Sequence, residues 1–338
     1  MSRSRSLRTS LTAALAALTM VAAGCGDSGS SGGDGPAVAK PAASAKGVTL
    51  RVGVQKDGIR PLLQKSGVLE GVPYKIEYSV FAFGPPLVEA AGADKIDVAA
   101  VGSTPPIFGA AAKANFRVVA TNQFENGQDD YLLTKDAAIT KPEQLKGKNI
   151  GVAKGSSAHG LLLNVLKRAG LSKDDVKISF LLPADGLAAF KTGRIDAWAV
   201  WSPFSTQGKQ AGGHSIAGGP PDEHGTNFSI ASTKAVEDPK RAAALKDYLE
   251  RLRKAYVWAG THRNEFAAAW SKETGLPEKV TRAAVPERLI RIRAVSDGDL
   301  RHQQALADLL ADQKVIPGKV TFKDVVTRGL ASQDEASR

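Results

Sequence analysis

The sequence predicts a mixed α/β protein of two lobes around a cleft, followed by a mainly helical C-terminal segment. From Val48 to about residue 230, short apolar or alternating runs are separated by runs of helical spacing. Strands that alternate with helices indicate largely parallel sheets. The alternation starts again near Lys141, which predicts a second sheet. After Asp238 the apolar spacing becomes almost wholly helical up to residue 313.

The first cycle of strands and helices supplies the first lobe. In residues 48–54, apolar and polar side chains alternate, as expected for a strand with one buried face. Proline is tolerated in the first turn of a helix, so residues 84–86 are predicted to open one. The predicted strands are residues 48–54, 74–81, 96–101 and 116–121, and the predicted helices are residues 61–69, one that opens at 84–86, and one that ends at 114.

The second cycle supplies the second lobe. Ser156 and Ser157 are suited to cap a helix that ends near Gly170, because serine caps helix starts and glycine adopts the left-handed conformation that ends them. Past residue 238, Pro277 and Pro286 break an otherwise helical region. The predicted strands are residues 131–134, 148–153, 176–182, 197–200 and 228–232, and the predicted helices are residues 156–169 and 184–192, with a last short helix at 319–330.

Two extended runs, near residues 129–134 and 227–232, are predicted to connect the lobes as a two-stranded hinge. A cleft between lobes that share such a hinge can close over a ligand. The predicted boundaries are residues 47–130 for the first part of lobe 1, residues 131–229 for lobe 2, and residues 230–338 for a mainly helical return that packs on lobe 1.

The N-terminus has the pattern of an export signal. Arginines at positions 3, 5 and 8 precede an uncharged apolar stretch at 11–23, which is too short to span a bilayer as a stable helix. It ends in Ala22-Ala23-Gly24-Cys25, which resembles a bacterial lipobox, although Ala22 stands where leucine is commoner. We therefore expect a signal peptide over residues 1–24, lipidation of Cys25, and a flexible tether over residues 25–46. The alternative is an ordinary cleaved signal.

Composition argues against several classes of function. Cys25 is the only cysteine, so the folded part has no thiolate nucleophile and no cysteine metal site. The five histidines are scattered without metal-ligand spacing, so we expect no metal, no cofactor and no catalysis. The net charge of +11 is spread among acidic residues rather than clustered, which disfavours nucleic acid as a partner. We expect the protein to be a monomer.

Three predicted strand-to-helix turns are suited to hold an anion: residues 84–86, 102–105 and 155–157. The first amides of a helix have no partner inside the helix and lie at the positive end of its dipole. Glycine lets the backbone approach a ligand closely, and a serine hydroxyl would add a donor. Converging on one cleft, such turns would make an anion site. Taken singly, each is equally an ordinary helix cap.

A sulfonate suits a site of amides and hydroxyls. It carries no proton at neutral pH and only accepts hydrogen bonds, and each hydrogen bond to a charged group contributes about 1.5–3 kcal/mol. Phosphate monoanion carries a proton that needs an acceptor. An organic tail would favour an apolar wall, for which Trp201, at the end of a predicted strand, is the candidate. Trp198 lies nearer the middle of that strand and suits the core.

Beyond the single turns, the chain carries short motifs in a fixed order. These are Phe83-Gly84-Pro85-Pro86, Ile96-Asp97, Val101-Gly102, Thr104-Pro105-Pro106-Ile107-Phe108, Leu145-Lys146-Gly147-Lys148, Lys154-Gly155-Ser156-Ser157-Ala158-His159, Leu161-Leu162-Leu163, Ala169-Gly170-Leu171, Leu182-Pro183-Ala184-Asp185 and residues 195–203. Together they resemble the aliphatic-sulfonate-binding proteins of ABC importers, in the nitrate, sulfonate and taurine group of solute-binding proteins. The resemblance covers residues 48–235 closely and the helical tail loosely.

The resemblance implies a two-lobed periplasmic-binding-protein fold, type II-like, with the ligand between the lobes. It also implies capture of an organosulfonate for sulfur acquisition, outside the cytoplasm, and delivery to a membrane permease with a cytoplasmic ATPase. By position, the expected ligand-binding residues are Gln55, Gly84, Pro85, Gly102, Ser103, Thr104, Ser156, Ser157, Ala158 and Trp201, with Asn227 and Phe228 at the second crossing.

One position departs from the family pattern. Many relatives place an acidic residue between the Gly and Thr of the second turn, where this chain has Ser103. The hypothesis that follows is that an amino-sulfonate such as taurine is less favoured than a plain alkyl- or aryl-sulfonate or a sulfate ester. Other small solutes of this fold, namely nitrate, bicarbonate, taurine or a pyrimidine precursor, remain alternatives, as does ligand sensing instead of transport.

Overall fold

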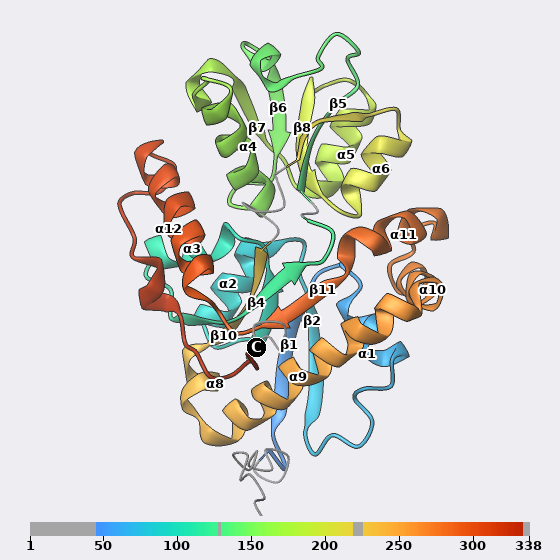
Figure 1. Cartoon of the computed structure of the whole chain (residues 1–338), viewed down its shortest axis with the longest axis vertical. Coiled ribbons are helices and arrows are strands. Elements are labelled where there is room, and N and C mark those ends of the chain that lie inside the picture. The colour runs from blue at the N-terminus through green and yellow to red at the C-terminus, as the bar shows by residue number, and fades with distance from the viewer. Residues whose placement is uncertain (1–44, 128–129, 219–225, 334–338) are drawn as a thin grey trace, which may run out of the picture. The chain divides into compact units, whose positions relative to one another are not determined.

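In the computed structural model, described for residues 45–127, 130–218 and 226–333, the strands form two sheets. One sheet has six strands in the order β11-β4-β10-β3-β1-β2, and the other has five in the order β7-β6-β8-β5-β9. Each sheet is the centre of one lobe (Figure 1). The chain leaves the first sheet after β4 (Phe116–Phe124), enters the second at β5 (Asp130–Thr134), and is back in the first at β10 (Thr226–Ser232).

The sheet of lobe 1 combines parallel and antiparallel pairs. β1 pairs in parallel with β2 and β3, whereas β10 runs antiparallel to β3 and β4, and β11 antiparallel to β4. Because β10 and β11 come from late in the chain and pair with β3 and β4, residues far apart in the sequence lie side by side in this sheet. The strands not yet located are β1 (Thr49–Val54), β2 (Lys75–Val80), β3 (Val98–Val101) and β11 (Ile290–Arg293).

Helices of lobe 1 cover both faces of this sheet. In β3, Val98 belongs to one buried cluster, with α9 and α10, while Ala99 and Val101 belong to another, with α2 and α12, as the alternation of a strand requires. The helices of this lobe are α1 (Ile59–Lys65), α2 (Gly84–Gly92), α3 (Pro105–Ala111), α8 (Thr233–Glu237), α9 (Pro239–Thr261), α10 (Arg263–Thr274), α11 (Glu278–Ala284) and α12 (Asp297–Asp312), with 3-10 turns η4 (Val285–Arg288) and η5 (Phe322–Val325).

Trp198, which is 1% exposed, is the largest side chain in one of the two apolar clusters of lobe 2. Its ring fits between two helices because Gly186 and Gly208 have no side chains there: a Cβ on Gly186 would lie 2.5 Å from the indole nitrogen. The elements of this lobe not yet located are β6 (Asn149–Val152), β7 (Lys177–Phe180), β8 (Ala197–Trp201), β9 (His214–Gly218), α4 (Ser157–Arg168), α5 (Pro183–Lys191) and α6 (Phe204–Gln210), with 3-10 turns η2 (Pro142–Leu145) and η3 (Lys173–Asp175).

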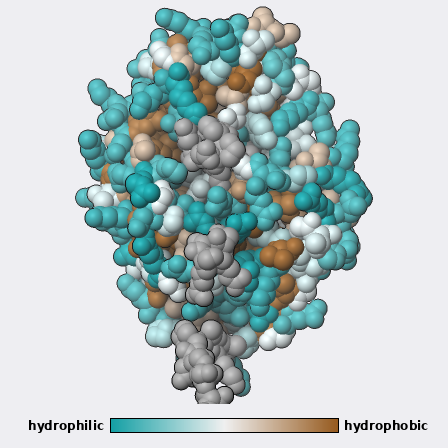
Figure 2. Space-filling view, viewed as in Figure 1, coloured by the Kyte–Doolittle hydropathy of each residue, from teal (hydrophilic) through white to brown (hydrophobic). Residues whose placement is uncertain are grey.

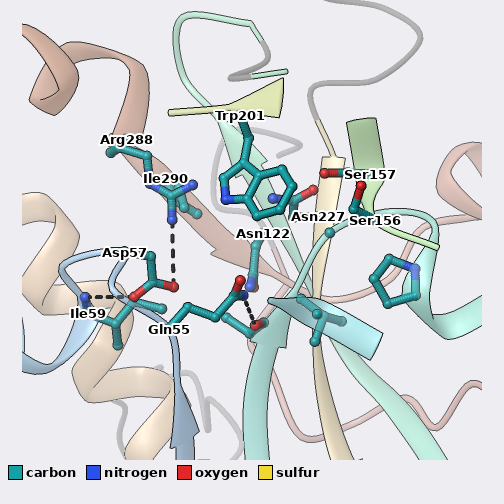
Figure 3. Close-up of a pocket in the computed structure, with 15 residues that line it drawn as sticks. Gln55, Asp57, Ile59, Asn122, Ser156, Ser157, Trp201, Asn227, Arg288 and Ile290 are labelled. Atoms are coloured by element: carbon teal, nitrogen blue, oxygen red, sulfur yellow. Dashed lines mark hydrogen bonds and ion pairs between the residues drawn. The ribbon is translucent and has the colours of Figure 1, made fainter. Parts of the chain in front are cut away.

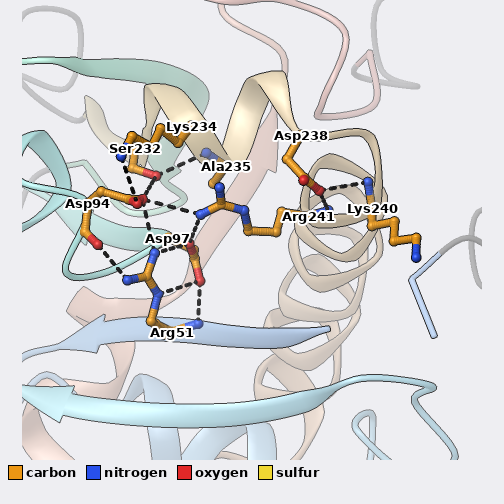
Figure 4. Close-up of polar contacts among 9 residues, drawn as sticks. All are labelled: Arg51, Asp94, Asp97, Ser232, Lys234, Ala235, Asp238, Lys240 and Arg241. Carbon is orange, nitrogen blue, oxygen red and sulfur yellow. Dashed lines mark hydrogen bonds and ion pairs between the residues drawn. The ribbon is translucent and has the colours of Figure 1, made fainter. Parts of the chain in front are cut away.

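A network of ion pairs ties the start of α9 to the sheet of lobe 1 (Figure 4). Asp97, which is fully buried, lies 2.7 Å from the Arg51 guanidinium and 3.3 Å from that of Arg241, and Asp94 pairs with the same two arginines. A buried carboxylate is stable only when it is paired and hydrogen-bonded. Arg51 is in the first half of β1 and Asp97 precedes β3, so the network lies at the edge of the sheet opposite the strand ends that open on lobe 2.

Several sequence predictions need correction. Two strands were missed: β11 lies in the region predicted to be helical, and β9 begins at His214. The helix predicted over 319–330 is wrong, because only η5 forms there and Thr327 N donates to Val118 O, so the backbone runs beside β4. Residues 130–134 and 226–232 are strands inside the two sheets rather than connectors between them.

The end of the predicted tether is also wrong. Ala45 is fully buried in the core of lobe 1, so the packed domain includes it. The predicted signal peptide, Cys25 and the rest of the tether lie outside the described residues. None of the helices in the described ranges combines the length and the apolar character that crossing a membrane requires. The face drawn in Figure 2 is mainly hydrophilic, with small separate apolar areas.

Candidate ligand-binding site

A pocket lies where the two lobes meet (Figure 3). Its volume is about 40 Å³, enough for about three water molecules. Lobe 2 contributes Ser156, Ser157 and Trp201, and lobe 1 contributes Gln55, Asp57, Ile59, Gly84, Ala100, Val101, Gly102, Pro105, Asn122, Asn227, Arg288 and Ile290. Most of these residues follow the carboxyl ends of strands, which is where open α/β sheets bind ligands.

The lobe 2 side of the pocket is the N-terminus of α4. Ser156 caps this helix, accepting a hydrogen bond from His159 N and donating from Oγ to Ala153 O at 2.7 Å. Ser157 Oγ donates to Asp130 Oδ1 at 2.9 Å. At Ser156 and Ser157, both hydroxyl protons are therefore used inside the protein. The amides of Ser156 and His159 are also bonded inside the protein, so the amides at this helix start that are left to face an anion are those of Ser157 and Ala158.

Two glycines let the lobes approach one another beside this helix. A Cβ on Gly102 would lie 2.6 Å from Ser157 Cβ, closer than side-chain atoms can pack. Gly155 has a φ of +75°, which glycine adopts without strain, and a Cβ there would lie 3.3 Å from Pro85 Cγ. Glycine is therefore needed at these two turns for two reasons: a side chain would block the contact between the lobes, and it would block access by a ligand.

An ion pair, Asp57 with Arg288, lies at one end of the pocket. Arg288 Nη2 is 3.8 Å from Asp57 Oδ2, and only 7% of each side chain is exposed. Asp57 Oδ1 accepts a hydrogen bond from Ile59 N at 3.2 Å. Burial raises the pKa of Asp57 above its usual value, and the charge of Arg288 opposes this rise. Figure 3 shows the pair on the opposite side of the Trp201 ring from Ser156 and Ser157.

Amide side chains line the floor of the pocket. Gln55 Nε2 donates to Ala100 O at 3.3 Å, which fixes the side chain at the end of β1. Asn122 Oδ1 accepts from Ser229 Oγ at 2.9 Å, so its amide nitrogen remains as the donor of that side chain. Asn227 stands opposite Asn122 in the β10–β4 ladder. The floor therefore offers neutral donors and acceptors between the two charged or dipolar ends.

Seven of the twelve residues expected from the sequence line this pocket: Gln55, Gly84, Gly102, Ser156, Ser157, Trp201 and Asn227. The other five, Pro85, Ser103, Thr104, Ala158 and Phe228, lie outside its lining. Phe228 is fully buried and packs on Phe322 at 5.6 Å between ring centroids, because strand alternation places it on the opposite face from Asn227. Thr104 Oγ1 faces Gly160 of α4, and Ser103 O accepts from the Gln303 amide.

Asp57, Asn122 and Arg288 were missed in the sequence. Asp57 carried a usable signal, because it follows Gln55 by two residues beyond the end of β1, at the same sheet edge as the predicted turns. Arg288 carried none, since it lies in a region whose spacing indicated helices throughout. Its place in the pocket depends on η4 and β11, which pair with distant parts of the chain.

A second bridge between the lobes adjoins Arg288. Glu287 Oε1 accepts from Tyr131 OH at 2.8 Å and lies 3.4 Å from Lys209 Nζ. The same ammonium group lies 3.4 Å from the centroid of the Tyr131 ring. Glu287 belongs to lobe 1, whereas Tyr131 and Lys209 belong to lobe 2. The short η4 turn thus supplies Arg288 to the pocket and the preceding residue, Glu287, to the contact between the lobes.

His159 supports the anion end without facing the ligand. It is 2% exposed, and its Nδ1 accepts a hydrogen bond from Gly155 N at 3.2 Å. Burial, with a smaller contribution from Lys154, lowers the pKa of His159 to about 4. The ring is therefore neutral at physiological pH and is buried beside the start of α4.

Comparisons with known proteins show which proteins this chain is similar to. The model of the NMT1/THI5-like family matches residues 86–265. A "Putative aliphatic sulfonates-binding protein" of Escherichia coli is 32% identical over 83% of this chain and 89% of its own length, and a protein of the same description from Bacillus subtilis is 32% identical over 92% of each.

A solved structure is similar in fold as well. The alkanesulfonate-binding protein SsuA from Xanthomonas axonopodis pv. citri, bound to MOPS, is 30% identical, with a TM-score of 0.78 over 84% of this chain and all of that one. This likeness agrees with the predicted two-lobed binding-protein fold, whose two sheets and interlobe pocket are described above. The chain belongs to the NMT1/THI5-like family, together with the sulfonate-binding relatives that it matches over most of its length.

Proposed function

We propose that this protein is an extracytoplasmic solute-binding protein that captures an aliphatic sulfonate between its lobes and delivers it to an ABC importer. The observation that carries the proposal is the pairing of Arg288 with the N-terminus of α4 around one interlobe pocket, in a chain whose full-length relatives are described as sulfonate-binding. Those relatives are described as binding proteins, so capture without reaction is the function proposed.

The chemistry of the pocket suits a sulfonate head group. A sulfonate offers three acceptor oxygens and one negative charge and has no proton to donate. Arg288 supplies donors in a fixed fork, and the α4 amides supply a positive dipole end. Trp201, partly exposed at the end of β8, supplies an apolar face for the carbon tail.

Delivery requires that the protein stay near the permease, and the N-terminus provides the means. We propose that residues 1–24 are removed as a lipoprotein signal, that Cys25 carries a lipid in the outer face of the cell membrane, and that the segment to residue 44 is the tether. The partners are then a permease and its cytoplasmic ATPase, and the protein acts as a monomer. Radiolabelled palmitate incorporated into the wild type but not into the Cys25→Ser variant tests the anchor.

Binding measurements with residues 26–338 test the ligand class. The panel contains butanesulfonate, benzenesulfonate, a sulfate ester, sulfate, nitrate, bicarbonate and a pyrimidine. A ligand at 100 times its dissociation constant adds about 2.7 kcal/mol to the free energy of unfolding, which raises the thermal midpoint by several degrees. The proposal predicts that an organosulfonate gives the largest rise. A rise with nitrate, bicarbonate or the pyrimidine, and none with any sulfonate, would contradict it.

A further inference from the structure

The pocket contains a charge that capture of a plain anion does not use. Asp57 is a carboxylate in the lining, buried in the same degree as Arg288. A site for a simple alkanesulfonate gains nothing from a negative charge beside its cation, because like charges within a few ångströms repel. The presence of Asp57 in the pocket therefore suggests a ligand that carries a positively charged or hydrogen-bond-donating group.

The geometry leaves Asp57 able to bind such a group. Its Oδ1 already accepts from Ile59 N, but the 3.8 Å separation between Oδ2 and Arg288 is longer than a hydrogen bond. An ionised carboxylate has about four acceptor positions, so capacity for a further donor remains. Burial raises the pKa of Asp57, which means that the surroundings penalise its charge and that a second cation nearby would relieve the penalty.

The charge balance of the loaded pocket points the same way. Asp57 and Arg288 carry opposite charges, and a bound alkanesulfonate brings a further negative charge into a largely buried space without a positive charge of its own. A ligand that carries both a sulfonate and an ammonium group adds no net charge and avoids this cost.

We propose that Asp57 binds an ammonium group on the ligand, and that the pocket selects zwitterionic aminosulfonates over alkanesulfonates of the same length. The inference rests on the proposed sulfonate-binding function and adds the ligand class. With Arg288 and Asp57 only 3.8 Å apart, a sulfonate on the arginine places an amine two or three carbon atoms away within reach of the carboxylate.

This proposal reverses the expectation drawn from Ser103. That expectation assumed that the only carboxylate available for an amine was the one missing from the second turn. In the structure, Ser103 lies outside the pocket lining and its backbone oxygen is bound by Gln303, whereas Asp57 lies in the lining. Asp57 lies after the end of β1, whereas many relatives place their acidic residue in the second turn, but either carboxylate can pair with an amine on the ligand.

A simpler role for Asp57 is to hold Arg288 in place. The two roles differ in what Asp57→Asn changes. A counterion that only positions Arg288 affects the affinity for every sulfonate by the same factor, so the ratio of affinities within a matched ligand pair stays constant. A carboxylate that binds the ammonium group affects one member of the pair more than the other, so the ratio changes.

Calorimetric titration of the chain without its first 25 residues tests the proposal with matched pairs. 2-Aminoethanesulfonate is compared with propanesulfonate, and 3-aminopropanesulfonate with butanesulfonate, since each pair differs by an ammonium in place of a methyl group. We expect the amine to bind roughly tenfold to a hundredfold more tightly in at least one pair, the range of a hydrogen bond between charged groups. In Asp57→Asn that ratio should fall to near one.

The control is Asp247→Asn, which removes a partly buried carboxylate bound to Tyr74 and distant in sequence from the pocket lining. It should keep the wild-type ratio. If the asparagine variant folds poorly, Asp57→Ser repeats the test. The ratio of affinities in the wild type is informative by itself, because measuring it requires no variant. A wild-type ratio of one or less, or a ratio that Asp57→Asn leaves unchanged, overturns this proposal while sulfonate binding stands. Binding of neither pair member refutes the proposed function itself.

Discussion

Replacing Arg288 with glutamine removes the only charged donor that the described residues place in the pocket lining. Glutamine keeps a donor and part of the length but not the charge. Since a hydrogen bond to a charged group contributes about 1.5–3 kcal/mol, we expect the dissociation constant for butanesulfonate to rise roughly tenfold to 150-fold. Isothermal titration measures this directly, and Arg291→Gln, an exposed residue three positions on, is the matched control.

The same variant makes a prediction about pH. Among the groups that oppose the burial-induced rise in the pKa of Asp57, Arg288 has the largest effect, so its loss raises that pKa further in the folded protein. A folded-state pKa above the unfolded value means that the folded protein binds the proton more tightly. Its free energy of unfolding therefore falls as pH rises from the unfolded value, about 4, through the folded one.

Urea unfolding of the wild type and of Arg288→Gln between pH 4 and pH 8 tests that sign. We expect the variant to lose up to about 3 kcal/mol at pH 7, the lower end for breaking a buried pair, and less at pH 4. An affinity within twofold of the wild type would refute the role of Arg288 in binding. A destabilisation that does not depend on pH would refute its electrostatic coupling to Asp57.

Three further changes test other parts of the site. Gly102→Ala should weaken sulfonate binding at least tenfold, because the added Cβ meets Ser157 of the other lobe. The control is Gly318→Ala, whose Cβ meets nothing within 4 Å and which should keep the wild-type affinity. Equal affinities of Gly102→Ala and the wild type in a titration would contradict this prediction. Glu287→Gln removes the charge that pairs with Lys209 and should weaken binding several-fold, chiefly through faster dissociation in stopped flow; an unchanged dissociation rate would count against a closing role. The pKa of His159, lowered to about 4, predicts that the free energy of unfolding falls by about 3 kcal/mol as pH drops from 6.5 to 4, and that His159→Gln removes this loss; an NMR titration midpoint near 6.5 would contradict it.

The local patterns of the chain predicted most elements of the fold. Strand alternation located β1, β3 and β10, and the serine cap located the start of α4, because these signals lie within a few neighbouring residues. β11 and the extended segment after η5 could not be found in this way. Both are held by pairing with β4, more than 160 residues earlier in the chain, and a few extended residues carry no signal of such a partner.

The site was predictable to the extent that it depends on strand ends. Gln55, Gly102 and Trp201 each follow or end a strand, so the fold class alone places them at the cleft. Which side of a turn faces the ligand was not predictable, because it depends on how the lobes meet. Thr104 faces α4 instead of the pocket for this reason, and Arg288 enters the pocket only because β11 holds η4 against β4.

The most direct test of the account is a crystal structure of the protein with butanesulfonate bound. We predict that the sulfonate group lies in the interlobe pocket, with an oxygen within hydrogen-bonding distance of the Arg288 guanidinium and the tail against Trp201. A sulfonate bound outside this pocket, or inside it but turned so that only its tail approaches Arg288, would contradict the central claim.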